Sequence, residues 1–205
     1  MIVHLARHGQ TVWHRPNRYA GRSDIDLDDV GRAQAGQLAR WAATARLDAL
    51  VSSDLRRAVD TAAPAARATG LTAVVDARLR EVDFGTAEGR TLAELGTDVA
   101  ERFVADPVTH HFPGGEPPGA AAARARAALD DLAATYPDGR VLVVAHSTLI
   151  RLVVCAALGV PLSDYRRRLP ALAPASRTVL RLEGDLTGDA ALLAYNVGVD
   201  PGCDA

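Results

Sequence analysis

The chain of 205 residues contains no lysine, so all 23 of its basic residues are arginines. With 25 acidic residues they give a net charge of −2. The sequence therefore lacks the surplus of positive charge that draws proteins to nucleic acids or anionic membranes, and we expect neither partner. What it has instead is arginine, whose planar fork of donors stays charged and matches the geometry of a phosphate group.

Cysteine is also scarce. The two cysteines, Cys155 and Cys203, are too few for a disulfide framework, and Cys155 lies in an apolar run typical of a buried small side chain. This usage indicates a reducing, cytoplasmic setting. Long apolar runs are absent as well, so we expect no transmembrane span, and the first residues lack the basic and apolar regions of a signal peptide.

Short apolar runs typical of strands alternate with helical patterns along the chain. Strands are expected at residues 2–6, 49–52, 72–76, 141–145, 178–182 and 191–195. Helices are expected at residues 31–45, 55–68, 92–104, 119–136 and 149–158. The alternation predicts an α/β fold, a three-layer α/β/α sandwich with a mostly parallel central sheet and an antiparallel edge strand. The length and a hydrophobic content of 48% suit a single domain over residues 1–205.

Local signals refine these elements. Asp54 is expected to cap the helix that follows it, and Gly70 to end that helix. Residues 106–119 are rich in proline and glycine, which indicates a surface loop. The arginine run at residues 166–168 is typical of a solvated face, with a subunit contact as the alternative.

The segment Arg7-His8-Gly9 follows the first expected strand. Ligands of open α/β sheets bind beyond the carboxyl ends of the strands, so this position suits an anion site. Arg7 offers a donor fork, His8 is a candidate nucleophile for a phosphoryl group, and Gly9 lets the backbone approach a ligand closely. Arg56 and Arg57 follow the second strand and His146 the fourth, so the topology predicts that residues at these strand ends converge.

Five segments carry a wider pattern. They are RHGQTVWH at 7–14, SSDLRRAVDTA at 52–62, LREVDFGTAEG at 79–89, FPGGE at 112–116 and VVAHSTLIR at 143–151. In this order the sequence resembles the histidine phosphatase superfamily, also called the phosphoglycerate mutase-like family.

The resemblance implies a catalytic role for five residues. His8 is the nucleophile that becomes phosphohistidine, Arg7 and Arg57 clamp the phosphate, and His146 is the second histidine of the pocket. Glu81 protonates the departing oxygen and then activates water, with Asp83 and Glu88 as nearby rivals for that role. The implied chemistry needs no metal and no cofactor.

The resemblance also implies the substrate-binding set Arg7, His14, Gly21, Arg57, His146 and Ser147. His14 stands where the family usually has asparagine, and Ser147 stands where it often has glycine. A lid-like segment is expected at about residues 92–119. The implied substrate is a small-molecule phosphate monoester, and a homodimer is a further expectation.

The sequence thus predicts a metal-independent phosphomonoesterase that forms a phosphohistidine on His8. A 2,3-bisphosphoglycerate-dependent phosphoglycerate mutase is the main alternative. Mutases of the family grip the second acidic group of their substrate with a lysine and a tandem arginine pair. This chain has no lysine and no such pair between Gly89 and Pro113, which favours the phosphatase. A non-catalytic phosphate-binding module is a second alternative, although His8, Glu81 and His146 are all present.

Overall fold

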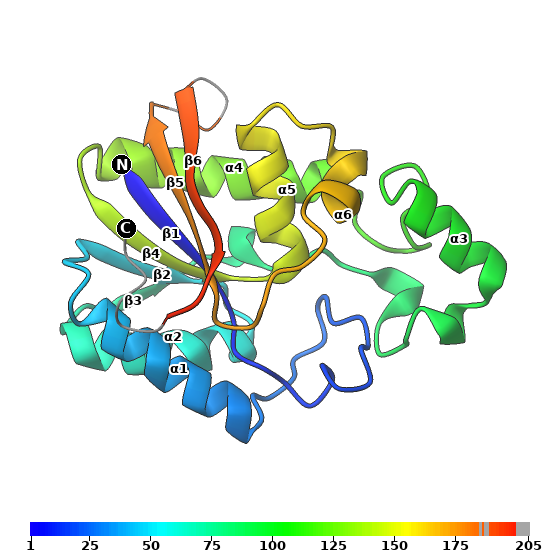
Figure 1. Ribbon diagram of the computed structural model, residues 1–205, viewed down its shortest axis with the longest axis horizontal. Coiled ribbons are helices and arrows are strands. Elements are labelled where there is room, and N and C mark those ends of the chain that lie inside the picture. Colours follow the sequence, from blue (N-terminus) through cyan, green and yellow to red (C-terminus); the bar gives the residue numbers. More distant parts are fainter. Residues whose placement is uncertain (185, 187–188, 200–205) are drawn as a thin grey trace.

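The computed structural model describes residues 1–184, 186 and 189–199. Its centre is a six-stranded sheet in the order β3-β2-β4-β1-β5-β6 (Figure 1). The strands are β1 (Ile2–Arg7), β2 (Ala49–Ser52), β3 (Ala73–Val75), β4 (Arg140–Ala145), β5 (Arg177–Glu183) and β6 (Asp189–Val197). The first four pair in parallel, whereas β5 is antiparallel to β1 and β6 is antiparallel to β5. The predicted mostly parallel sheet with an antiparallel edge is confirmed.

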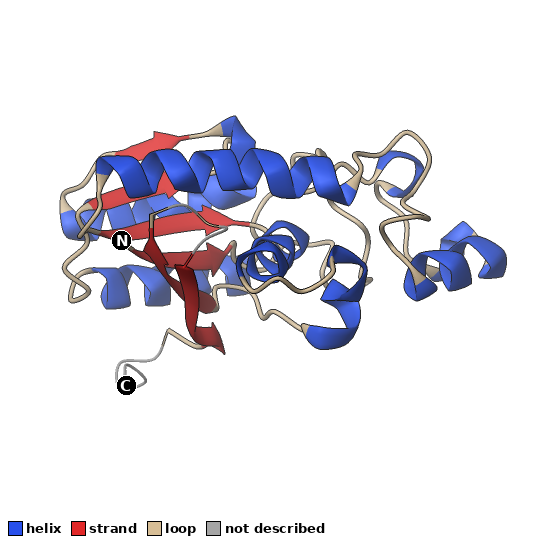
Figure 2. Cartoon of the chain, turned by 90° about the horizontal axis from the view of Figure 1, so that it is seen from above, coloured by secondary structure: helices blue, strands red, loops and turns tan. Residues whose placement is uncertain are grey.

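Helices cover both faces of the sheet (Figure 2). The helices are α1 (Asp29–Ala42), α2 (Arg56–Thr69), α3 (Thr97–Ala105), α4 (Pro118–Thr135), α5 (Ser147–Ala157) and α6 (Tyr165–Arg168). Leu142 and Val144 of β4 pack with α1 and α2, whereas Val141 and Val143 pack with α4 and α5. A strand with two covered faces is apolar at every position, which explains the continuous apolar run of β4. The three-layer sandwich is therefore confirmed.

The end of α2 agrees with the prediction, whereas the residue that caps its start does not. Gly70 ends α2 in the left-handed conformation, at φ +73°, as predicted. The prediction that Asp54 caps α2 was wrong, because its carboxylate pairs with the Arg80 guanidinium. The first N–H of the helix, that of Arg56, donates instead to Asp24 Oδ1 at 2.8 Å. The capping carboxylate therefore comes from a segment 32 residues away.

The segment predicted as one helix over 92–104 is broken. Gly96 adopts φ +89° and separates a 3₁₀ turn at Ala93–Leu95 from α3, which lies beyond the end of the sheet, apart from the three layers (Figure 1). The expected loop at 106–119 was two residues too long, because α4 already begins at Pro118. The short helix α6 was not predicted.

Among the described residues, no helix combines the length and apolar character that crossing a bilayer requires. Cys155 is buried, as predicted, and Cys203 lies outside the described residues.

Candidate active site

A cavity of about 730 Å³ opens where β1 and β4 end. Its walls come from the segment after β1, the Glu81 loop, the start of α5, and α6. Of the predicted site residues, the cavity is lined by Arg7, His8, His14, Glu81 and Ser147. The remaining predicted residues, Gly21, Arg57 and His146, are buried and are not among the residues that line the cavity. Parallel strands that end at one edge thus bring together residues up to 140 positions apart.

His8 is buried at the end of β1, and its ring has one defined orientation. Its Nδ1 atom lies 2.7 Å from the Gly9 carbonyl oxygen, which can only accept, so Nδ1 carries the proton. Burial lowers the pKa of His8 well below its ordinary value, and the nearby Arg57, His146 and Arg7 lower it further. The ring is therefore neutral, and its Nε2 lone pair is available for attack on an electrophile.

His146 lies beside His8, with ring centroids 5.2 Å apart. It directly precedes α5 and is fully buried, and neither ring nitrogen has a hydrogen-bond partner among the described residues. Burial, followed by the charge of Arg57, lowers its pKa well below the ordinary value. An unpaired buried ring is costly, so His146 is suited to donate to a ligand at this point.

Two guanidinium groups sit next to these rings. Arg57 is fully buried, and its Nη atoms donate to the carbonyl groups of Ala20, Gly21 and Ser23 at 2.7–3.1 Å. Within the part of the chain that the structure describes, its Nε has no partner, and neither has the buried Nε of Arg7. Burial lowers the pKa of Arg7 to about 10, so both groups remain cationic at neutral pH. Donors without acceptors, grouped around a neutral histidine, match the needs of a bound anion.

Gly21 was predicted to bind substrate, and in the structure its backbone groups bind other residues of the protein. Its N–H donates to Glu88 Oε1 at 2.8 Å, and its carbonyl accepts from Arg57. A Cβ at Gly21 would lie 2.2 Å from that carboxylate oxygen. Glycine is thus required at this position by the packing of protein against protein.

Glu81 is buried, and its carboxylate points at the N-terminus of α5. It accepts hydrogen bonds at 2.9 Å from the backbone N–H groups of Val82, Thr148 and Leu149. Among the described residues that line the cavity, it is the only one with a carboxylate. The two rivals face elsewhere: Asp83 pairs with Arg22 at 3.0 Å, and Glu88 anchors a neighbouring loop.

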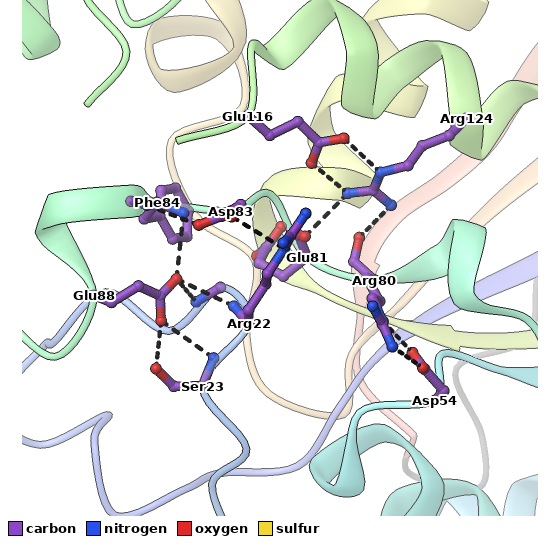
Figure 3. A network of polar contacts seen from close by, with 12 residues as sticks. Arg22, Ser23, Asp54, Arg80, Glu81, Asp83, Phe84, Glu88, Glu116 and Arg124 are labelled. Atoms are coloured by element: carbon purple, nitrogen blue, oxygen red, sulfur yellow. Dashed lines mark hydrogen bonds and ion pairs between the residues drawn. The ribbon is translucent and has the colours of Figure 1, made fainter. Parts of the chain in front are cut away.

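Two networks hold the loops around Glu81, and both are shown in Figure 3. In the first, the Glu88 carboxylate accepts from the backbone N–H groups of Gly21, Arg22, Ser23 and Phe84. These bonds fix the loop whose carbonyl groups hold Arg57. Sequence reasoning considered Glu88 only as a rival acid, because three of these four partners lie more than 60 residues away.

The second network centres on Arg124 of α4. Its guanidinium forms a two-pronged ion pair with Glu116, both bonds being 2.8 Å. It also donates to the carbonyl groups of Arg78, Arg80 and Glu81 at 2.7–3.0 Å. Figure 3 shows the contacts with Arg80 and Glu81. Arg124 therefore fixes the backbone that carries Glu81, a role that the sequence did not reveal.

Gly9 was expected to let the backbone approach a ligand. The close approach is instead to α1, because a Cβ on Gly9 would lie 2.6 Å from the carbonyl oxygen of Gly31. A Cβ on Gly31 would in turn lie 2.0 Å from the carbonyl oxygen of Gln10. The pair lets the start of α1 pack directly against the segment that follows His8.

The far wall of the cavity is aromatic and basic. All three phenylalanines of the chain, Phe84, Phe103 and Phe112, pack around Tyr19 with ring centroids 4.9–5.8 Å from it. The reading of residues 166–168 as a solvated face was partly wrong. Arg166 is half-buried, lines the cavity and stacks on Phe103, with its Cζ 5.2 Å from the ring centroid.

No group of three or more His, Cys, Asp or Glu side chains that could hold a metal ion occurs in the part of the chain that the structure describes. Two aspartates that lie close together in the sequence, Asp24 and Asp28, cap helices. Asp24 caps α2, and Asp28 caps α1 by accepting from the Gly31 N–H at 2.8 Å.

Comparison with known proteins gives a family match. The sequence profile of the histidine phosphatase superfamily (branch 1) matches residues 3–194. A bifunctional protein of Mycobacterium tuberculosis is 42% identical over 164 residues, which cover 75% of this chain and 43% of that protein. The match thus spans less than half of the length of that relative.

Other relatives match over most of their length. A glucosyl-3-phosphoglycerate phosphatase of M. tuberculosis is 36% identical, over 78% of this chain and 77% of its own. A probable phosphoglycerate mutase of Erwinia tasmaniensis is 33% identical, over 80% of this chain and 78% of its own. The solved structure of the mycobacterial glucosyl-3-phosphoglycerate phosphatase with VO3 superposes with a TM-score of 0.88 at 32% identity, covering 96% of this chain and 99% of that one.

Proposed function

The chain belongs to the histidine phosphatase superfamily (branch 1), and within it we propose that the chain is a metal-independent phosphomonoesterase acting on small phosphorylated metabolites. The observation that carries the proposal is the state of His8. It is a neutral buried histidine with its proton fixed on Nδ1 and its Nε2 lone pair at a cavity surrounded by guanidinium groups.

In the first step, His8 Nε2 attacks the phosphorus atom and the bond between phosphorus and the ester oxygen breaks. The Glu81 carboxyl group gives its proton to the departing oxygen. Arg7, Arg57 and His146 stabilise the charge on the equatorial oxygens, which is the main demand of phosphoryl transfer. The hydrogen bond from His8 Nδ1 to the Gly9 carbonyl stabilises the positive charge that develops on the phosphorylated ring.

In the second step, the Glu81 carboxylate takes a proton from water, and the resulting oxygen attacks phosphorus. The bond between phosphorus and His8 Nε2 breaks, inorganic phosphate leaves, and the neutral ring is restored. Glu81 has the position for both steps, because it lines the cavity while its rivals Asp83 and Glu88 are engaged elsewhere.

Residues 92–119 are proposed as the lid over this site. Leu92 and Val104 line the cavity, and Phe103 stacks on Phe112 at 4.2 Å, which makes the segment a packed unit. Its aromatic contacts with Tyr19 join it to the loop after His14.

The test compares two histidine variants in p-nitrophenyl phosphate hydrolysis. We expect His8→Ala to lower kcat by at least about a thousandfold, because the nucleophile is lost. His110→Ala is the matched control, since this histidine, although it belongs to the proposed lid, is exposed and does not line the cavity. The wild type should also form an acid-labile phosphoprotein that His8→Ala does not form.

The two alternative functions, a mutase and a phosphate-binding module, would give different results in such assays. A mutase would interconvert the two monophosphoglycerates and would require 2,3-bisphosphoglycerate. A binding module would bind vanadate without hydrolysing any ester. Full hydrolysis by His8→Ala would overturn the proposal.

A further inference from the structure

Two arginines in the cavity wall, Arg151 of α5 and Arg166 of α6, take no part in the mechanism above. Neither forms an ion pair with a carboxylate of the described residues. Two other arginines of the wall are compensated, since Arg18 pairs with Glu94 and Arg167 pairs with Asp164. Besides Arg7, which the mechanism assigns to the phosphate, the wall therefore contains two positive charges without a counterion among the described residues.

Arg151 is 9% exposed and held rigidly. Its Nε donates to the Ser147 carbonyl at 3.2 Å, its Nη1 donates to the Leu169 carbonyl at 3.3 Å, and its Cζ lies 4.8 Å from the ring centroid of Tyr165. A buried charge without a counterion is costly. A guanidinium that is fixed in place and lacks a counterion is prepared for an anionic ligand.

Arg166 approaches the cavity from the neighbouring helix. Stacking on Phe103 holds its guanidinium, and the hydroxyl groups of Tyr19 and Tyr165 lie beside it. Both Arg151 and Arg166 thus contact Tyr165, and both line the same cavity. The two arginines belong to α5 and α6, whereas His8 follows β1.

The charges of the site indicate what this pair binds. Among the described residues, four guanidinium groups at the site have no carboxylate partner, those of Arg7, Arg57, Arg151 and Arg166. The charges of Arg7 and Arg57 match those of a bound phosphate dianion. Arg151 and Arg166 then remain for a further anionic group, and the cavity of about 730 Å³ has room for the molecule that would carry it.

We propose that Arg151 and Arg166 form a second anion site that binds a carboxylate on the organic part of the substrate. This inference rests on the proposed function, because it places the phosphate of the same molecule at His8. The enzyme then prefers phosphate esters of hydroxy acids over phosphate esters of neutral alcohols.

The experiment uses two esters that differ in one group. 3-Phosphoglycerate carries a carboxylate where glycerol 3-phosphate carries a hydroxymethyl group. For the wild type, we expect kcat/KM to be about ten- to hundredfold higher for the carboxylate ester, the gain typical of a charge-assisted bidentate contact. Arg166→Gln should reduce this ratio towards one, mainly through KM.

Arg168→Gln is the matched control. It removes an arginine from the same helix that is 53% exposed, pairs with Asp164 and does not line the cavity, so the ratio should stay at the wild-type value. Arg151→Gln should act as Arg166→Gln does. If it fails to fold because Arg151 is buried, Arg166→Gln decides the matter.

Binding measured by calorimetry separates this inference from the proposed function. His8→Ala protein, which cannot turn over either ester, should bind 3-phosphoglycerate more tightly than glycerol 3-phosphate, and His8→Ala/Arg166→Gln protein should not. A wild-type ratio near one, or equal losses for both esters in Arg166→Gln, would overturn the second anion site while p-nitrophenyl phosphate hydrolysis still supports the phosphatase. Discrimination in binding without any hydrolysis would keep the site and overturn the phosphatase.

Discussion

The Nη2 atom of Arg7 lies 2.7 Å from Nε2 of His14. On the other side of the same ring, Nδ1 lies 2.9 Å from the Thr11 hydroxyl oxygen. A guanidinium can only donate, so Nε2 accepts from Arg7 and the proton of the neutral ring is on Nδ1. His14 therefore holds the Arg7 guanidinium by a hydrogen bond, at the position where the family usually has asparagine, whose side-chain oxygen can accept in the same way.

The first prediction concerns that replacement. Burial and the charge of Arg7 lower the pKa of His14 to about 4, so the ring stays neutral from pH 5.5 to 8. His14→Asn keeps an acceptor for Arg7 and should keep kcat/KM within about tenfold and the same pH profile, whereas His14→Ala should lose about ten- to hundredfold. Profiles of kcat/KM against pH report the free enzyme and provide the check. An ionisation seen in the wild type but absent from His14→Asn would contradict the assignment.

The second prediction is a dependence of stability on pH. The pKa values of buried His8 and His146 are lowered well below the ordinary value, whereas in the unfolded chain both titrate near about 6.5. Below that pH the unfolded chain binds protons that the folded chain does not, so stability falls as the pH falls. Between pH 7.5 and 5.5 each histidine should cost about 1 kcal/mol of unfolding free energy.

Urea unfolding at the two pH values checks this. His146→Asn should reduce the difference between them by about 1 kcal/mol, because one buried neutral ring is removed. The exposed His110 is the control, and His110→Ala should leave the difference unchanged. A pH difference that is the same in wild type and His146→Asn would show that His146 is charged in the folded chain.

Much of this site could be predicted because topology and motif agree. Arg7 and His146 each follow an apolar run, and parallel strands end at a common edge, so their proximity follows from the order of the elements. Glu81 follows no strand, and only the resemblance to the family singled it out. Its position becomes understandable from the N–H groups at the start of α5 that hold its carboxylate.

What could not be predicted depends on pairs of segments that are distant in the chain. Asp24 caps α2 in place of Asp54 because a long loop returns to that helix end, and no local pattern encodes such a return. Arg166 was read as a surface residue because it belongs to a run of three arginines. Its guanidinium is partly covered because it stacks on Phe103, a residue more than 60 positions away in the sequence.

The third prediction tests Arg124 as a positioning residue for Glu81. Arg124→Met should lower kcat with little change in KM, because the Glu81 backbone loses a hydrogen bond while the phosphate clamps stay. It should also cost about 2 kcal/mol of stability, since the partly buried Glu116 carboxylate loses its partner. Arg126→Met on the same helix removes only an exposed pair with Asp130 at 3.8 Å and should change neither quantity measurably. A loss confined to KM would contradict the positioning role.

The last prediction uses two glycines of α1 that differ only in their surroundings. A Cβ at Gly31 would lie 2.0 Å from the Gln10 carbonyl oxygen, whereas one at Gly36 would meet nothing closer than Arg40 Nη1 at 4.0 Å. Gly31→Ala should therefore push α1 away from the segment that follows His8, costing about 1–3 kcal/mol and lowering kcat. Gly36→Ala has the same helix propensity gain without a clash and should stabilise the protein by about 0.5–1 kcal/mol. Thermal unfolding of both variants checks this pair, and equal shifts would show that α1 does not depend on the close approach at Gly31.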